Sequence, residues 1–171
     1  CIYENSVYPH SQHGMTGVMI GAGVKLCNFT QWQYGMASVD FRWNVSGSFM
    51  QVVPRFVSVD ENGVECEFLR DVFADSTEMF DSIFLKGYQW PFSYERLEAS
   101  SCVDIAVHNE IRQGRKVYLD YTQNPDGFSF DLLGDEAREY LTANNAVAPT
   151  PIERLELLNP KAIDVYARQG I

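Results

Sequence analysis

The sequence is poor in basic residues and has no apolar run long enough to cross a bilayer. Its 171 residues include 13 lysines and arginines against 23 aspartates and glutamates, a formal net charge of -10. Binding to nucleic acid or anionic lipid depends on clustered positive charge, so this balance argues against both partners. A transmembrane helix needs roughly 20 apolar residues, so no membrane span is expected. The N-terminus also lacks a signal-peptide pattern, and a cytoplasmic location is expected.

Cysteine and histidine are too scattered to form a metal site that the sequence would reveal. The four cysteines, Cys1, Cys27, Cys66 and Cys102, form no C-x-x-C pair, so we expect neither a zinc site nor a redox dithiol. His10 and His13 stand three residues apart without an acidic or cysteine partner nearby. We interpret them as loop residues, and we expect no bound metal.

The remaining composition is that of one globular α+β domain. Apolar residues make up 46% and charged residues 21% of the chain, which are ordinary globular values. Residues 49–59 are rich in β-branched side chains, 60–63 read Asp-Glu-Asn-Gly, and 64–69 return as a second apolar run. This pattern predicts a β-hairpin. We expect a small mixed sheet containing this hairpin, covered by several helices.

Capping signals mark the helices. Asp75 precedes Glu78 by three residues, and Thr150 precedes Glu153 by three, which is the spacing of a capping box. Gly114 provides a left-handed helix end. The pattern predicts helices at 14–25, 75–87, 101–113, 135–143, from 150 onward and from 160 to 169, with strands at 26–34 and 116–121. Because small residues dominate 14–25, that helix is expected to be buried against another backbone.

Three blocks of the sequence resemble the succinate dehydrogenase, fumarate reductase and L-aspartate oxidase flavoproteins. Residues 22–28 with Gln33-Tyr34 resemble the family's A-G-A-x-L-x-N…Q-F segment, and 60–63 with Phe68 resemble its V-N-x-D-G-x-R-F hairpin. Residues 105–120, which include Glu110-Ile-Arg-Gln-Gly-Arg115 and Val117-Tyr-Leu-Asp120, are similar to its E-I-x-x-G-R…V-Y-L-D stretch. The order and spacing persist through all three blocks.

The resemblance implies that the chain is an internal part of an FAD-dependent oxidoreductase. In the family, these blocks form the edge of the FAD-binding domain and the capping domain, which closes over the flavin and a small carboxylate. Residues 1–35 are then expected to be the edge of the FAD-binding domain, and 36–171 an incomplete capping, substrate-binding domain. Both ends of the chain look abrupt, which agrees with an internal segment. FAD would belong to the parent protein, and the fragment alone is expected to be inactive.

Several residues are candidates for the site. The family's substrate histidine is replaced at Gln33-Tyr34-Gly35, and no arginine stands in the G-x-R-F position. We therefore propose other residues, chosen because guanidinium and amide groups bind carboxylates. The candidates are Arg42 and Arg55 as catalytic clamps, Tyr34, Asn44 and Ser46 as substrate contacts, and Gly14 and Gly17 as cofactor-facing glycines.

The alternative function comes from a different class of protein. Trp90 lies in an aromatic stretch, 88–96, and the chain is strongly acidic. Protein interfaces commonly use Trp, Tyr and Phe rimmed by charge. The chain could therefore be a stand-alone acidic interaction module. In the flavoprotein interpretation, the same aromatic loop would instead dock on the remaining FAD-binding domain.

Overall fold

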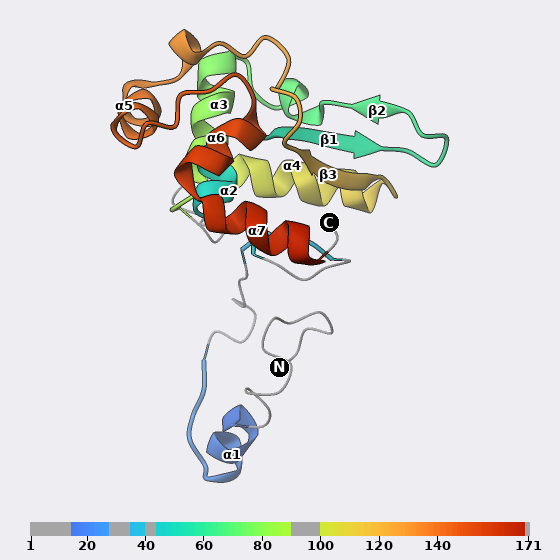
Figure 1. Cartoon of the computed structure of the whole chain (residues 1–171). Helices are drawn as coiled ribbons and strands as arrows, with labels where there is room; N and C mark the ends of the chain where they lie inside the picture. Colours follow the sequence, from blue (N-terminus) through green and yellow to red (C-terminus); the bar gives the residue numbers. More distant parts are fainter. Residues whose placement is uncertain (1–14, 28–34, 40–43, 90–99, 170–171) are drawn as a thin grey trace.

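A computed structural model describes residues 15–27, 35–39, 44–89 and 100–169 (Figure 1). The predicted α+β fold is confirmed: a small antiparallel sheet has several helices around it. The sheet holds β1 (Arg55–Val59), β2 (Glu65–Cys66) and β3 (Lys116–Asp120) in the order β2-β1-β3. Both pairings are antiparallel, with Ser58 opposite Cys66 and Val57 opposite Tyr118.

The helices follow the capping signals closely. They are α1 (Met15–Gly21), α2 (Ser48–Gln51), α3 (Ser76–Leu85), α4 (Ser101–Arg112), α5 (Asp135–Ala143), α6 (Pro151–Leu158) and α7 (Pro160–Gln169). Two short 3-10 turns, η2 (Phe68–Asp71) and η4 (Phe130–Leu132), complete the described elements. The side chain of Asp75 accepts from the Glu78 N–H at 3.0 Å, and Thr150 with Glu153 forms the full reciprocal capping box.

One apolar core joins the sheet to the helices. The side chains of Phe56, Phe68, Phe80, Phe84 and Val103 are all buried in it, and they come from β1, η2, α3 and α4. Val117 and Leu119 of β3 pack against the same core, on the sheet face that α4 covers (Figure 1). A second, smaller cluster forms where Phe49 and Val52 contact α6 and α7.

Three sequence predictions about local structure are wrong. Residues 49–51 are helical rather than extended, because Gly47 has φ 61° and turns the chain into α2 before Pro54 starts the strand. The second hairpin strand is only Glu65–Cys66, and 68–71 form a 3-10 turn. The apolar positions of the predicted helix at 101–113 indicate that Ile105 and Ile111 face the core, but in α4 they are 39% and 57% exposed. Most of the predicted strand at 26–34, from 28 onward, lies outside the described residues.

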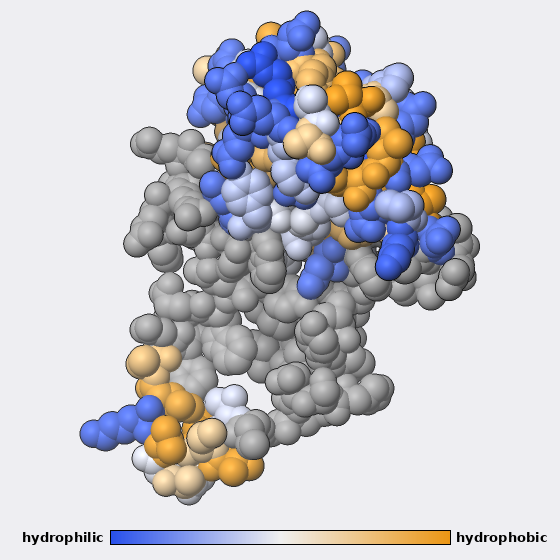
Figure 2. Space-filling model, turned by 60° about the vertical axis from the view of Figure 1, so that its left-hand side comes forward, coloured by the Kyte–Doolittle hydropathy of each residue, from blue (hydrophilic) through white to orange (hydrophobic). Residues whose placement is uncertain are grey.

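The glycine-rich helix forms, but it is not buried. Residues 16–27 are all exposed, and a Cβ added to Gly17, Gly21 or Gly23 would have no neighbouring atom within 4 Å. The prediction of a close backbone partner for this helix therefore fails within the described part of the chain. Figure 2 shows a group of apolar side chains on this segment, at the bottom of the view.

Candidate functional site

The loop before α2 contains two of the candidate substrate residues, Asn44 and Ser46. Asn44 forms a β-bridge with Ala37, and the Val45 N–H donates to the Met36 carbonyl at 3.0 Å. Gly47 then has φ 61° and ψ -135°, a conformation that essentially only glycine adopts. The loop is therefore shaped by its backbone, which presents Asn44 and Ser46 beside each other.

Both side chains have unused hydrogen-bonding capacity. The Oδ1 atom of Asn44 is buried and has no hydrogen-bond partner, although such a group normally finds one. The half-buried Ser46 hydroxyl likewise forms no hydrogen bond with any described residue. Leaving a buried acceptor unpaired costs about 1–3 kcal/mol. A donor from a ligand or from another part of the protein would remove that cost at Asn44.

The end of α3 holds this loop in place. The Gly47 N–H donates to the Gly87 carbonyl at 2.7 Å. A Cβ at Gly87 would lie 2.4 Å from Gln51 Cγ, 2.9 Å from the Gly47 oxygen and 3.0 Å from the Phe84 oxygen, so position 87 must be glycine for this approach. The amide of Gln51 is in turn fixed by the Tyr140 hydroxyl, which donates to it at 3.0 Å.

The far side of the loop is fixed by the C-terminal helices. The Asn159 Nδ2 donates to the Ser48 hydroxyl at 3.0 Å, and Tyr121 donates from its hydroxyl to the Phe49 carbonyl at 3.0 Å. These contacts join residues separated by 111 and 72 positions in the chain. Asn44 and Ser46 therefore precede a helix that is held on two sides, which suits a preorganised binding loop.

Arg55 lies at the start of β1, where acidic side chains surround it. Its guanidinium contacts Glu67 at 2.5 Å, Asp120 at 3.2 Å and Glu65 at 3.5 Å. The hydrogen bond to Glu67 raises the pKa of Arg55, so the side chain stays charged. One positive charge among three carboxylates leaves a negative surface, which repels a carboxylate substrate. This geometry argues against the prediction that Arg55 clamps the substrate, and assigns it to holding the sheet together.

We expect Arg55→Ala to lower stability. Three carboxylates would remain close together without their cation, and the loss should be about 2–3 kcal/mol, the size of a lost hydrogen bond to a charged group. Part of that loss should be recovered in high salt, because salt screens repulsion between partly exposed charges. Urea unfolding at low and high NaCl concentration measures both effects, with the exposed Arg112→Ala as the matched control. An Arg55→Ala chain as stable as wild type would contradict the structural role.

Arg115 has a structural role that the sequence alone does not indicate. The sequence shows only that Arg115 belongs to the block at 105–120. Its Nε lies 3.0 Å from a Glu110 carboxylate oxygen and 2.8 Å from the Ser58 hydroxyl. Another guanidinium nitrogen donates to the carbonyls of Ser58 and Val64, each at 3.0 Å, and Asp60 is 3.8 Å away. Arg115 therefore connects α4, the centre of β1 and the hairpin turn.

Of the other candidates, only Gly17 lies among the described residues. Gly17 lies in the exposed α1, and a Cβ added to it would have no neighbouring atom within 4 Å. Gly14, Tyr34 and Arg42 lie outside the described residues, as does the aromatic loop around Trp90. Their predicted roles stay predictions. Between Arg55 and the pair Asn44 and Ser46, the described residues show no hydrogen bond or ion pair.

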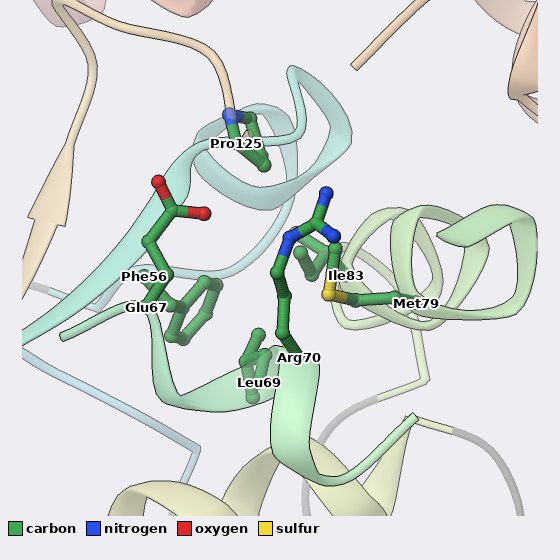
Figure 3. Close-up of a pocket in the computed structure, with 7 residues that line it drawn as sticks. All are labelled: Phe56, Glu67, Leu69, Arg70, Met79, Ile83 and Pro125. Atoms are coloured by element: carbon green, nitrogen blue, oxygen red, sulfur yellow. The ribbon is translucent and has the colours of Figure 1, made fainter. Parts of the chain in front are cut away.

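A small cavity lies between the sheet and α3 (Figure 3). Glu67 and Arg70 extend beside each other toward Pro125, above apolar side chains (Figure 3). Its lining residues are Phe56, Glu67, Leu69, Arg70, Met79, Ile83 and Pro125. The volume that the centre of a water molecule can occupy in this cavity is about 10 Å³, so the cavity has room for about one water. The cavity is therefore too small for a flavin or a dicarboxylate.

The described residues also lack a metal site and a membrane-spanning helix. Within them, no three His, Cys, Asp or Glu side chains lie grouped as ligands for a metal ion. None of their helices has the length and apolar character needed to span a bilayer. No disulfide joins Cys27, Cys66 and Cys102, the three cysteines in the described part of the chain.

Comparisons with known proteins add no relative to this geometry. No protein-family model, curated protein or solved structure matches the chain. The likeness to flavoproteins therefore depends on the three sequence blocks alone.

Proposed function

We propose that the chain is the capping, substrate-closing region of an FAD-dependent oxidoreductase that resembles the fumarate reductase and succinate dehydrogenase flavoproteins. The parent enzyme would transfer hydride between its flavin and a small carboxylate-like substrate. The observation that carries the proposal is the position of Arg115. It belongs to the block similar to E-I-x-x-G-R, and it bonds to Glu110 of the same block and to the hairpin turn of the preceding one.

This arrangement explains in physical terms why each of the two blocks contains the residues that it does. The turn needs Asp60 and Gly63, because the Asp60 side chain accepts from two turn N–H groups and Gly63 has φ 81°. Arg115 needs Gly114 at φ 80° to leave α4 and reach that turn. Motifs that are 50 residues apart in the sequence thus support one sheet and one helix. The contact between the two blocks supports reading them as parts of one motif.

The exposed segment 16–27 supports a missing FAD-binding domain. It exposes Val18, Met19, Ile20, Val24 and Leu26 by 39% to 66%, with Lys25 as its single charged residue. Apolar groups gathered in this way are usually covered by a partner surface. In the proposal, that surface is the rest of the parent chain.

The residues of this chain would contribute substrate contacts rather than the cofactor site. The cavity of the described region cannot hold FAD, and Gly17 makes no cradle for it. Asn44 and Ser46 offer an unpaired amide oxygen and a free hydroxyl, and they follow the segment that contains Arg42. We assign these three residues, with Tyr34, to the substrate, and leave Arg55 to the sheet. We also propose a cytoplasmic location for the parent protein, a compartment in which cysteines such as Cys27 and Cys66 stay reduced.

Expression of the whole gene tests this function. The purified parent protein should be yellow, and denaturation should release FAD that is measurable by absorbance. Addition of small dicarboxylates such as succinate and fumarate should perturb the flavin spectrum. Arg42→Ala should lower kcat/KM at least about tenfold, or about 1.4 kcal/mol, whereas the exposed Arg112→Ala should not change it. A colourless protein that does not take up added FAD would refute the proposal.

A further inference from the structure

Among the described residues, no strand pairs with the outer edge of β3. The Asp60 N–H donates across the hairpin to Val64, so even-numbered residues of β1 point their backbone groups at β2 and odd-numbered ones at β3. With Val57 opposite Tyr118, the N–H and C=O groups of Val117 and Leu119 then point away from β1. No described residue outside β1 forms a backbone hydrogen bond with residues 116–120. Four backbone groups are thus available to another strand.

The sequence of this edge is complementary to itself. β3 reads Lys-Val-Tyr-Leu-Asp from 116 to 120. When two copies run antiparallel about Tyr118, Lys116 of each chain faces Asp120 of the other, and the two copies of Tyr118 face each other. Opposite charges and aromatic pairs placed directly across two strands are stabilising. A shift of two residues in register would remove both ion pairs, so the charges select a single alignment.

The side-chain directions agree with this alignment. Val117 and Leu119 carry the outward backbone groups, so they would form the hydrogen-bonded pairs of the new ladder. Lys116, Tyr118 and Asp120 would then occupy non-hydrogen-bonded pairs, where side chains approach most closely. They lie on the face of β3 opposite to the core, and Tyr118 is 50% exposed.

The two charged residues can both accept this role. Lys116 is exposed and has no ion pair with any described residue. Asp120 receives Arg55 on one oxygen and Thr122 on the other, but a carboxylate has about four acceptor sites. Asp120 is therefore held in place and can still receive a lysine ammonium.

We propose that two copies of this chain pair through β3 across a two-fold axis, which joins their three-stranded sheets into one continuous antiparallel sheet. The interface is isologous, since the same five residues contribute from each side. This inference is independent of the proposed oxidoreductase function, and its test needs neither flavin nor substrate.

The first test removes an outward N–H group. Val117→Pro removes the N–H group that would donate to the second copy, and it leaves intact the N–H groups that pair β3 with β1. The matched variant Val117→Ala shortens the side chain but keeps this N–H group. Sedimentation equilibrium of the 171-residue chain should show a dimer. Val117→Pro should weaken it at least about tenfold, and Val117→Ala should weaken it less. A wild-type chain that stays monomeric up to roughly 1 mM, or a folded Val117→Pro chain that dimerises normally, would overturn the proposal.

The second test does not depend on Val117→Pro folding. Tyr118→Cys would place two thiols across the axis, where Cα atoms of a non-hydrogen-bonded pair are about 4.5 Å apart, within the range that a disulfide spans. Mild oxidation should convert most of this variant into a covalent dimer on a non-reducing gel. Wild type, with its native thiols, and the exposed Gln113→Cys are the controls. Equal cross-linking of all three would show that Tyr118 does not lie at a two-fold axis.

Discussion

Replacing Arg154 with methionine should lower the free energy of unfolding by about 3–5 kcal/mol, because a buried cluster of oxygens loses its donor. Arg154 is fully buried in α6, and its guanidinium stacks over the Phe128 ring at 4.6 Å from the centroid. Burial lowers its pKa to about 10, so the side chain is still charged at neutral pH. Its acceptors are the carbonyls of Val52, Ala148 and Pro149 and the Asn124 amide oxygen, at 2.8–3.4 Å.

The acceptors explain why lysine should not replace Arg154. All of them are neutral oxygens that lie in different directions, and a planar guanidinium has five N–H groups to reach them. Arg154→Lys keeps the charge but can satisfy fewer acceptors, so we expect it to lose at least about half as much stability. Arg138→Met, which removes a partly exposed arginine of α5, should change stability by about 0.5 kcal/mol or less. Urea unfolding followed by circular dichroism compares the three variants, and a loss below about 1 kcal/mol for Arg154→Met would contradict this role.

The ion pair between Lys86 and Asp104 should behave differently, because both partners can be removed together. Lys86 at the end of α3 is 2% exposed, and its Nζ lies 2.6 Å from an Asp104 oxygen in the first turn of α4. Burial raises the pKa of Asp104, and the bond from Lys86 opposes that effect. Lys86→Met or Asp104→Leu alone should each cost about 3–5 kcal/mol, since each leaves a buried charge unpaired.

The double variant distinguishes two free energies: the net contribution of the ion pair to stability, and the cost of leaving one buried charge without its partner. Lys86→Met with Asp104→Leu should recover to within about 1 kcal/mol of wild type, or exceed it, because neither buried charge is then left without its partner. A double-mutant cycle built from four unfolding curves gives the coupling free energy. The exposed pair Arg138 and Asp135 provides the control cycle, with an expected coupling of at most about 0.5 kcal/mol. Additive losses at Lys86 and Asp104 would show that the two side chains act separately.

The parts of the fold that depend on neighbours in the sequence were predictable. The Asp75 and Thr150 caps, the Asp60–Gly63 turn and the glycine after α4 each act within a few residues, so the sequence displays the whole interaction. The α5 boundaries were predicted residue for residue. Failure came where a distant contact decides the conformation. Residues 49–51 lead into the β-branched pair Val52 and Val53, but the conformation of Gly47, whose N–H bonds to Gly87, starts a helix there.

The candidate site shows the same division. Asn44 and Ser46 were chosen by residue type, and their role as substrate contacts stays a prediction, which the unpaired Asn44 Oδ1 supports. Arg55 was chosen by the same reasoning, yet its partners Glu67 and Asp120 are 12 and 65 positions away, and no local pattern indicates them. Arg154 was missed for that reason also, because its contact with Val52 spans 102 positions. Ion pairs and hydrogen bonds between residues far apart in the chain cannot be predicted from a single sequence.

The central strand, β1, pairs with β2, which is close in the sequence, and with β3, which is distant in the sequence. This difference in sequence separation sets the order in which the sheet can assemble. β1 meets β2 through a four-residue turn, whereas pairing Val59 with Lys116 closes a loop of more than 50 residues. Loop-closure entropy grows with length, so the hairpin can form early and β3 must arrive after α3 and α4 have shortened the distance. The rate-limiting step of folding should therefore be the docking of β3. Until β3 docks, the edge of β1 that pairs with β3 stays exposed. Strands of other chains can then pair with that edge.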